Sequence, residues 1–418
     1  MKRRGLRWWP LGLLLMGGAA GLLVWQARQP GQSAVAAPEL PSSAAVAHVA
    51  ALPALARQPE AASAGLTTHA ASSPLQSKVA KEFVDVCGVG RIRRSELEPG
   101  EGQSEPVWSH ELNRLNEQGL SDMLKRLDAG SLRQRVAAAA LRGDAQTAAQ
   151  LAAGSDDVNA YRIALQACRK DQGYRSAYLL TKQQAQLAAS AASGLEMPEF
   201  KPPGPLPSAC AGINLERLES FDPGDAWPWL LRLSDAITRN DQTGVSQALY
   251  QVAQRSRLSA NARILSATMA EVVGPEPTPG ESWALASALG TDMMSLGDGS
   301  PINVARPCSV DALKDANRRQ LCEQVVRRMP GMVKEGIDAR ALHVLEERLG
   351  IAHSPEALSR EDLDRRLKGI GEESMQWMAE PTCANFSKMG QLVVHLTRNG
   401  ELAMMRAQLK AVPASGPR

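Results

Sequence analysis

The sequence is poor in aromatic residues: only 4% of its 418 residues are Phe, Tyr or Trp. Ala, Leu, Gln and Arg are abundant instead. Because alanine and straight-chain residues lose little entropy in a helix, this composition favours an all-α fold. The sequence also lacks a clear run of alternating apolar and polar residues, so it predicts no β-strand.

The short motifs that mark common enzymes and metal proteins are absent. No Cys-x-x-Cys pair occurs, which excludes zinc ribbons and thioredoxin-like redox sites. The chain also has no His-Glu-x-x-His helix, no Gly-x-x-x-x-Gly-Lys phosphate loop and no Gly-x-Ser-x-Gly elbow. No two histidines after residue 77 stand three or four positions apart, the spacing that places two ligands on one helix face. We therefore expect no catalysis, no cofactor and no metal.

Positive charge is concentrated at the start of the chain. The formal net charge is +3, and Lys2, Arg3, Arg4 and Arg7 supply four positive charges, which leaves −1 for the rest of the chain. A nucleic-acid partner requires concentrated basic charge against its phosphates. We therefore expect no nucleic-acid partner.

An uncharged apolar segment follows this basic start. Residues 8–25 contain no charged side chain, and a helix of that length covers about 27 Å, close to the thickness of the hydrocarbon core of a bilayer. Basic residues stay on the cytoplasmic side, so residues 1–28 are predicted to be a single-pass anchor in a bacterial inner membrane, with the rest of the chain in the periplasm. Its flanking residues are Arg3, Arg4, Arg7, Trp8 and Trp25.

A cleaved signal peptide is the alternative, because it shares the basic start and the apolar run. The plausible Ala-x-Ala site, Ala34-Val35-Ala36, ends eleven residues after Trp25, which is late for cleavage. Cleavage would release the same domain into the periplasm.

A linker and a long helical domain follow. Residues 29–77 are rich in Ala, Pro and Ser, with three charged side chains and no aromatic residue. Such a segment cannot bury enough apolar surface to offset its ordering entropy, so it is predicted to be a flexible, disordered linker. Residues 78–418 form the predicted periplasmic domain, with sub-boundaries expected near 200–210 and 272–308, where Gly and Pro gather.

Helical spacing of apolar residues recurs throughout this domain. Helices are expected near residues 112–127, 131–141, 145–153, 157–169, 174–191, 212–220, 225–239, 242–255, 259–271, 281–289, 316–329, 338–349, 360–378 and 385–409. Short helices and short turns without heptads indicate stacked helical hairpins rather than one long bundle.

One segment carries a recognisable pattern. Residues 222–230 read Asp-Pro-Gly-Asp-Ala-Trp-Pro-Trp-Leu, and Arg-Asn-Asp follows at 239–241. The Asp-Pro opening, the early Trp and the Asn-Asp turn resemble a tetratricopeptide repeat over about 222–255. Asp222 or Asp225 is suited to cap the first helix, and Asp241 to cap the second.

This resemblance implies a partner-binding scaffold. The segment departs from the family pattern at Arg232, Leu233 and Val245, and related turns at Asp144 and Gly400 are unevenly spaced. We therefore expect an irregular array of tetratricopeptide-like hairpins that binds other envelope proteins. The candidate residues of an interaction groove are Trp227, Trp229 and Tyr250, for which packing inside the hairpin is the alternative.

An alternative function rests on Glu281. Glu281-Ser282-Trp283 resembles the Glu-Ser start of lytic transglycosylases, in which a glutamate is the general acid. The Gly-Leu-Met-Gln continuation is missing, and Thr291-Asp292-Met293-Met294 stands instead. The resemblance implies peptidoglycan binding or cleavage, whereas the simpler interpretation places Glu281 in the first turn of a helix.

Six cysteines lie in the predicted periplasmic domain, where an oxidising environment allows disulfides. Their pairing is expected to be Cys168–Cys210, Cys308–Cys322 and, by elimination, Cys87–Cys383. Cys308 and Cys322 can meet only if the helix between them breaks near residues 315–317, because fourteen helical residues span about 21 Å. Six buried free thiols are the alternative.

Overall fold

The computed structural model describes residues 82–97, 106, 108–173, 205, 207–258, 263–274, 276–295, 299–354 and 357–411. The predicted anchor at 1–28, the linker at 29–77 and the helix at 174–191 lie outside the described residues. No helix within the described part is long and apolar enough to cross a membrane.

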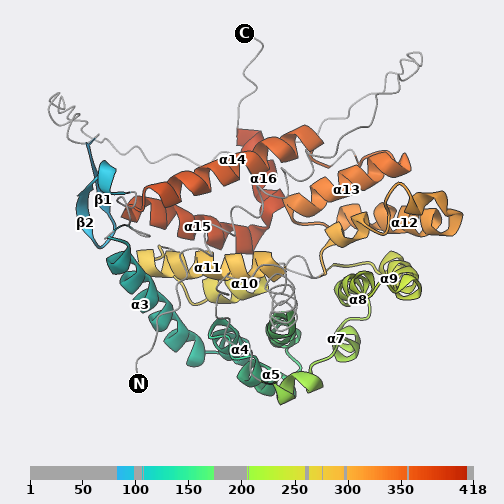
Figure 1. The fold of residues 1–418 in the computed structure, drawn as a ribbon, viewed down its shortest axis with the longest axis horizontal. Coiled ribbons are helices and arrows are strands. Elements are labelled where there is room, and N and C mark those ends of the chain that lie inside the picture. Colours follow the sequence, from blue (N-terminus) through green and yellow to red (C-terminus); the bar gives the residue numbers. More distant parts are fainter. Residues whose placement is uncertain are drawn as a thin grey trace, which may run out of the picture. The chain divides into compact units, whose positions relative to one another are not determined.

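The described part is built almost entirely of helices, which confirms the all-α fold (Figure 1). Its α-helices are α3 (Ser109–Asp128), α4 (Leu132–Leu141), α5 (Ala145–Ala152), a helix over residues 158–173, α7 (Leu215–Phe221), α8 (Trp227–Thr238), α9 (Gln242–Gln254), α10 (Ile264–Ala270), α11 (Pro279–Ser295), α12 (Ala316–Arg328), α13 (Gly336–Leu349), α14 (Arg360–Ala379), α15 (Cys383–Asn399) and α16 (Glu401–Ala411). Short 3-10 turns η1 (Arg94–Glu96), η2 (Ser208–Gly212), η3 (Pro301–Ala305), η4 (Ala312–Lys314) and η5 (Met329–Gly331) lie between them.

The expectation that the domain contains no strand was wrong. Strand β1 (Phe83–Val86) pairs with β2 (Gly90–Arg93) in an antiparallel hairpin. Val84 and Val86 are buried while Asp85 is exposed, so an alternating pattern exists. It covers only four residues, which is too short to stand out in the sequence.

The single helix expected over 385–409 was also wrong, because it is two helices. Gly400 has a φ of 77°, a left-handed value that separates α15 from α16. Glycine adopts this conformation without steric cost, so the chain turns there. The cap predicted for the second helix of the 222–255 segment is confirmed: Asp241 accepts a hydrogen bond from the Gly244 amide at the start of α9. Asn240, which follows the end of α8, has a φ of 53°.

Two groups of buried apolar residues form the core. The first joins residues of α3, α4, α5, 158–173, α10, α11 and α15, and the second joins residues of α8, α9, α12, α13 and α16. Helix α8 contributes to both: Trp227 and Leu231 lie in the first group, and Trp229, Leu230 and Leu233 in the second. Because these positions cover opposite sides of one helix, α8 lies between the two cores and packs against both.

Helix α11 packs against both α3 and α15 (Figure 1). At the contact with α3, a Cβ on Gly119 would lie 2.4 Å from the backbone of Gly280. Real Cβ atoms do not approach so closely, so two glycines facing each other set the separation of these helices.

We predict that Gly119→Ala lowers the free energy of unfolding by about 1–3 kcal/mol, because the added methyl forces α3 and α11 apart. The intrinsic preference of alanine for helices, about 1 kcal/mol, opposes this loss without cancelling it. Gly154→Ala is the matched control, since a Cβ there meets no atom within 4 Å. Denaturant midpoints measure both variants, and equal midpoints would contradict the close-contact argument.

Candidate functional site

Three disulfides join distant parts of the described chain, and none of its cysteines is free. The pairs are Cys87–Cys383, Cys168–Cys210 and Cys308–Cys322, separated by 296, 42 and 14 residues. These are the pairings expected from the sequence. Together they tie the β-hairpin to α15, the helix at 158–173 to η2, and the segment after η3 to α12.

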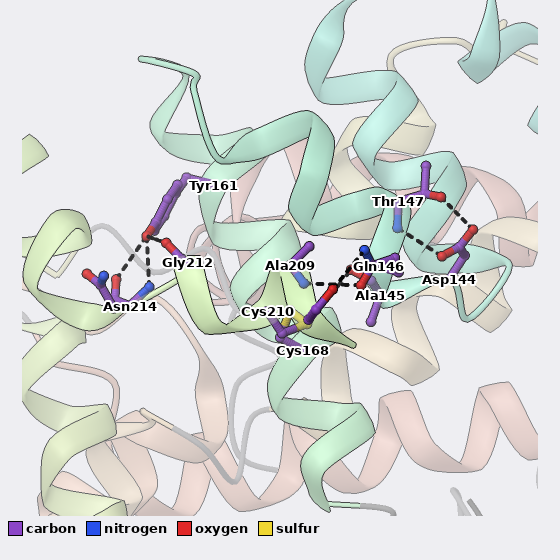
Figure 2. Close-up of a disulfide and its surroundings, with 11 residues drawn as sticks. Asp144, Ala145, Gln146, Thr147, Tyr161, Cys168, Ala209, Cys210, Gly212 and Asn214 are labelled. Atoms are coloured by element: carbon purple, nitrogen blue, oxygen red, sulfur yellow. Dashed lines mark hydrogen bonds between the residues drawn. A yellow bond between two sulfur atoms is a disulfide. The ribbon is translucent and has the colours of Figure 1, made fainter. Parts of the chain in front are cut away.

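The Cys168–Cys210 bond lies in a network of backbone contacts that fixes the η2 turn (Figure 2). The Gln146 side chain accepts a hydrogen bond from the Ala209 amide at 3.1 Å. Nearby, the Tyr161 hydroxyl accepts from the Asn214 amide at 2.8 Å (Figure 2). The disulfide and these side-chain bonds therefore hold one irregular turn in place, which is a structural role.

The Cys308–Cys322 bond requires the break that the sequence analysis placed near residues 315–317. Helix α12 begins at Ala316, and the side chain of its N-cap, Asp315, accepts a hydrogen bond from the Arg318 amide. The chain before it forms the short turn η4, so the two cysteine Cα atoms lie 5.9 Å apart. The break is therefore found at the start of the predicted turn.

The three residues expected to form a groove do not do so. Trp227 and Trp229 are buried at 4% and 7% exposure, in different cores, whereas Tyr250 is 50% exposed on α9. The expectation was wrong because α8 buries both of its faces, so its tryptophans serve packing. Of the three, Tyr250 is the residue whose ring is open to a partner.

Trp229 sits at the edge of its core, within a group of charged side chains. Its Nε1 donates a hydrogen bond to Glu219 at 2.9 Å, and the Arg232 guanidinium lies 4.4 Å from the ring centre. Arg255 pairs with the same Glu219 at 2.9 Å. Cation–π contact and ion pairing thus join α7, α8 and the end of α9 around one indole.

Glu281 stands in the first turn of α11, in the position that the simpler interpretation predicted. It accepts a hydrogen bond from the Thr278 amide at 2.7 Å and pairs with Arg126 of α3. Burial raises the pKa of Glu281, but the hydrogen bonds from Thr278 and Arg126 outweigh it and hold the pKa below its usual value. A glycosidase general acid needs the opposite shift.

A cavity of about 300 Å³ lies among α4, α10, α15 and the helix at 158–173. Its lining includes Asn159, Thr268 and Arg398 together with Arg133 and Glu271, which pair at 2.8 Å. This volume is at the lower limit for a small-molecule site. The Glu271 carboxylate in its lining is paired with Arg133 and is therefore not placed as a free base.

Comparison with protein-family models, with curated proteins and with solved structures gives no match.

Two histidines and a glutamate meet in space in a way that the sequence analysis missed. His343 and Glu346 lie on α13, and His353 follows the end of that helix. The two histidines are ten positions apart, so no helical spacing connects them. Gly350, with a φ of 68°, turns the chain back at the end of α13 and brings His353 over His343. A glycine at the predicted helix end followed by a histidine was the available signal.

Buried carboxyl groups form a second feature that the sequence did not reveal. Asp292 of α11 is 2% exposed and accepts hydrogen bonds from the amides of Leu265 and Ser266 and from the Ser266 hydroxyl. Arg263 pairs with both Glu335 and Glu401, at 2.5 and 3.2 Å. Burial raises the pKa of Asp292 and of Glu335 to about 7, although hydrogen bonds at Asp292 and Arg263 at Glu335 oppose it.

We predict that the folded protein contains no free thiol when it is isolated from an oxidising compartment and counted under denaturing conditions. The Cys308→Ser/Cys322→Ser double variant should lose about 3 kcal/mol of unfolding free energy, because a fourteen-residue loop regains its freedom in the unfolded chain. Cys87→Ser/Cys383→Ser, which opens a far longer loop, should lose more. Six reactive thiols in the wild-type protein would refute the pairing.

We also predict that stability falls as the pH rises. Because the folded pKa of Asp292 is about 7, above that of an unfolded aspartate, the folded state binds the proton more tightly. The stabilisation is therefore complete below about pH 4 and is lost as the pH rises through 7, a loss of roughly 2–4 kcal/mol from this group.

Thermal unfolding of Asp292→Asn across this range measures the contribution. The variant keeps an oxygen acceptor and cannot ionise, so the fall in stability should be smaller than in the wild type. Asp311→Asn, at a fully exposed carboxylate, should leave the fall unchanged. A wild-type profile that rises between pH 5 and 8 would contradict the assignment.

Proposed function

We propose that this protein is a membrane-tethered scaffold of the bacterial envelope, in which a periplasmic helical domain binds other proteins without catalysis. The observation that carries the proposal is the complete pairing of the described cysteines in three disulfides. Such bonds persist in oxidising compartments and are rare in the cytosol. The basic and apolar start of the sequence supports the same address.

The tether of the proposal consists of the anchor at 1–28 and the flexible linker at 29–77, with the N-terminus cytoplasmic. The first described element after the linker is the β-hairpin. The hairpin is tied to the first residue of α15 by the Cys87–Cys383 bond, and the Cys87 amide donates a hydrogen bond to the Pro381 carbonyl just before that helix. Arg94, which follows the hairpin, pairs with Glu380 between α14 and α15. In this proposal the linker leads into a hairpin that a disulfide ties to the start of α15.

The proposed binding role rests on the α8–α9 hairpin within an irregular, tetratricopeptide-like array. Helices α8 and α9 pack against each other across the Asn240 turn, and α9 also packs on α12. Helical hairpins stacked in this way present one helix face to partners. Tyr250, half exposed on α9, is the aromatic residue that such a surface offers. The geometry of Glu281, paired with Arg126, does not favour the peptidoglycan alternative.

Cell fractionation tests the address. With a tag at the C-terminus, the full-length protein should remain in the membrane pellet after an alkaline wash, and protease added to opened periplasm should digest the domain. A variant with Arg3, Arg4 and Arg7 replaced by glutamate should lose this orientation. Recovery of a shortened protein in the soluble periplasmic fraction would indicate cleavage, and recovery in the cytosol would refute the proposal.

Site-specific photo-crosslinking tests the binding role separately. A photoreactive residue at Tyr250 should give a discrete cross-linked product with an envelope protein in living cells. The matched control is the same residue at Lys125 of α3, whose side chain is 72% exposed. Equal products at both positions, or none at either, would contradict binding through α9.

A further inference from the structure

We infer that His343, Glu346 and His353 form a binding site for a divalent transition-metal ion of the zinc class. Of the described residues, these three are the group whose ligand atoms lie within 4.8 Å of one another. Helix α13, which carries His343 and Glu346, contributes Leu342 and Leu345 to the second core, and none of the three residues lines the cavity. Neither the scaffold function nor the disulfides account for their arrangement.

The three ligand atoms already surround a common point. Nδ1 of His353 lies 2.9 Å from Nδ1 of His343 and 2.5 Å from Oε2 of Glu346. Nδ1 of His343 lies 3.5 Å from the same Oε2. Tetrahedral ligands at about 2.0–2.1 Å from zinc are separated from one another by about 3.4 Å. Small side-chain rotations therefore suffice to bring the three atoms to that spacing.

The orientation of His343 is set by its other ring nitrogen. Nε2 lies 2.7 Å from the Leu358 carbonyl, which only accepts hydrogen bonds, so Nε2 carries hydrogen. In the neutral ring, Nδ1 then carries no hydrogen, and its lone pair is directed at His353 and Glu346. A backbone carbonyl that fixes the tautomer of a histidine in this way is typical of metal ligands.

The charge of the site also favours a cation. Glu346 is 3% exposed and His343 is 5% exposed, and both lie one helical turn apart on α13. The ion-pair partners of the Glu346 carboxylate in the described structure are these two histidines. A metal ion between the three atoms would supply two positive charges where a buried carboxylate needs them.

Two imidazoles and one carboxylate are the donor set that suits zinc, and copper or nickel less specifically. The side chain of His353 is 43% exposed, so the fourth position of a bound ion would face solvent. Three protein ligands with an open position distinguish this site from a closed structural zinc site. Binding would also fix residues 350–354 on α13.

Titration of the full-length protein in detergent tests the site. The affinity tag must contain no histidine, and bound metal is first removed by a chelator. Zn²⁺ should bind with one equivalent at micromolar affinity or tighter and should raise the unfolding temperature. Co²⁺ should give the intense visible bands of a tetrahedral site with nitrogen ligands, a signal that a general stabilising effect of salt would not produce.

Variants decide whether these residues are the ligands. His353→Ala removes the exposed ligand and leaves the two buried ones, so the fold should persist while Zn²⁺ affinity falls by about a hundredfold or more. Glu346→Gln keeps the size of the side chain and should weaken binding in the same direction. His395→Ala, at a histidine of α15 whose Nδ1 lies 3.1 Å from Nδ2 of Asn399, is the matched control and should bind as the wild type does.

Three outcomes would overturn the inference. Absence of saturable Zn²⁺ binding would show that the cluster is a hydrogen-bond network alone. Equal affinity in His353→Ala and the wild type would place the metal at other residues. Cobalt bands that survive both His353→Ala and Glu346→Gln would exclude the proposed ligand set even if the protein binds metal.

Discussion

The ion pair between Arg162 and Asp225 is the contact on which the arrangement of the two cores depends. Arg162 lies in the helix at 158–173, and Asp225 precedes α8; their side chains are 8% and 1% exposed and meet at 2.6 Å. Asp225 also accepts a hydrogen bond from the Trp227 amide, and the Arg162 guanidinium lies 5.6 Å from the Trp227 ring. Breaking a buried ion pair by removing one partner typically costs 3–5 kcal/mol.

This pair fixes the start of the one helix that belongs to both cores. Because α8 is apolar on two sides, its rotation about its own axis has to be specified, or Trp227 and Trp229 would exchange environments. The ion pair at the beginning of α8 and the hydrogen bond from Trp229 Nε1 to Glu219 of α7 define that rotation. Apolar burial supplies the driving force for packing, whereas these directional contacts choose the arrangement.

Local features of this fold could be predicted from the sequence, and contacts between distant residues mostly could not. The caps at Asp241 and Asp315 and the positive φ of Asn240 follow from residue type at a helix boundary. The disulfides were the exception among distant contacts, because six cysteines limit the pairings and the third pair follows by elimination once two pairs are assigned. The prediction of a groove at Trp227, Trp229 and Tyr250 was wrong because a sequence shows that a helix is apolar but not how many of its sides are buried.

The His343–Glu346–His353 cluster illustrates the same limit from the other direction. Motif spacing detects ligands that share one helix face, and it has no means of detecting a ligand that returns after a turn. Here Gly350 reverses the chain, and the Leu358 carbonyl lies 2.7 Å from Nε2 of His343. The cluster is therefore built by a helix end, and its geometry depends on a short loop as much as on α13. If metal binds there, it joins the loop to the helix in the way that Cys308–Cys322 joins its own loop to α12, with the difference that a ligand-held loop can be released. A domain with three permanent cross-links and one reversible one would keep its cores fixed while residues 350–354 respond to the metal.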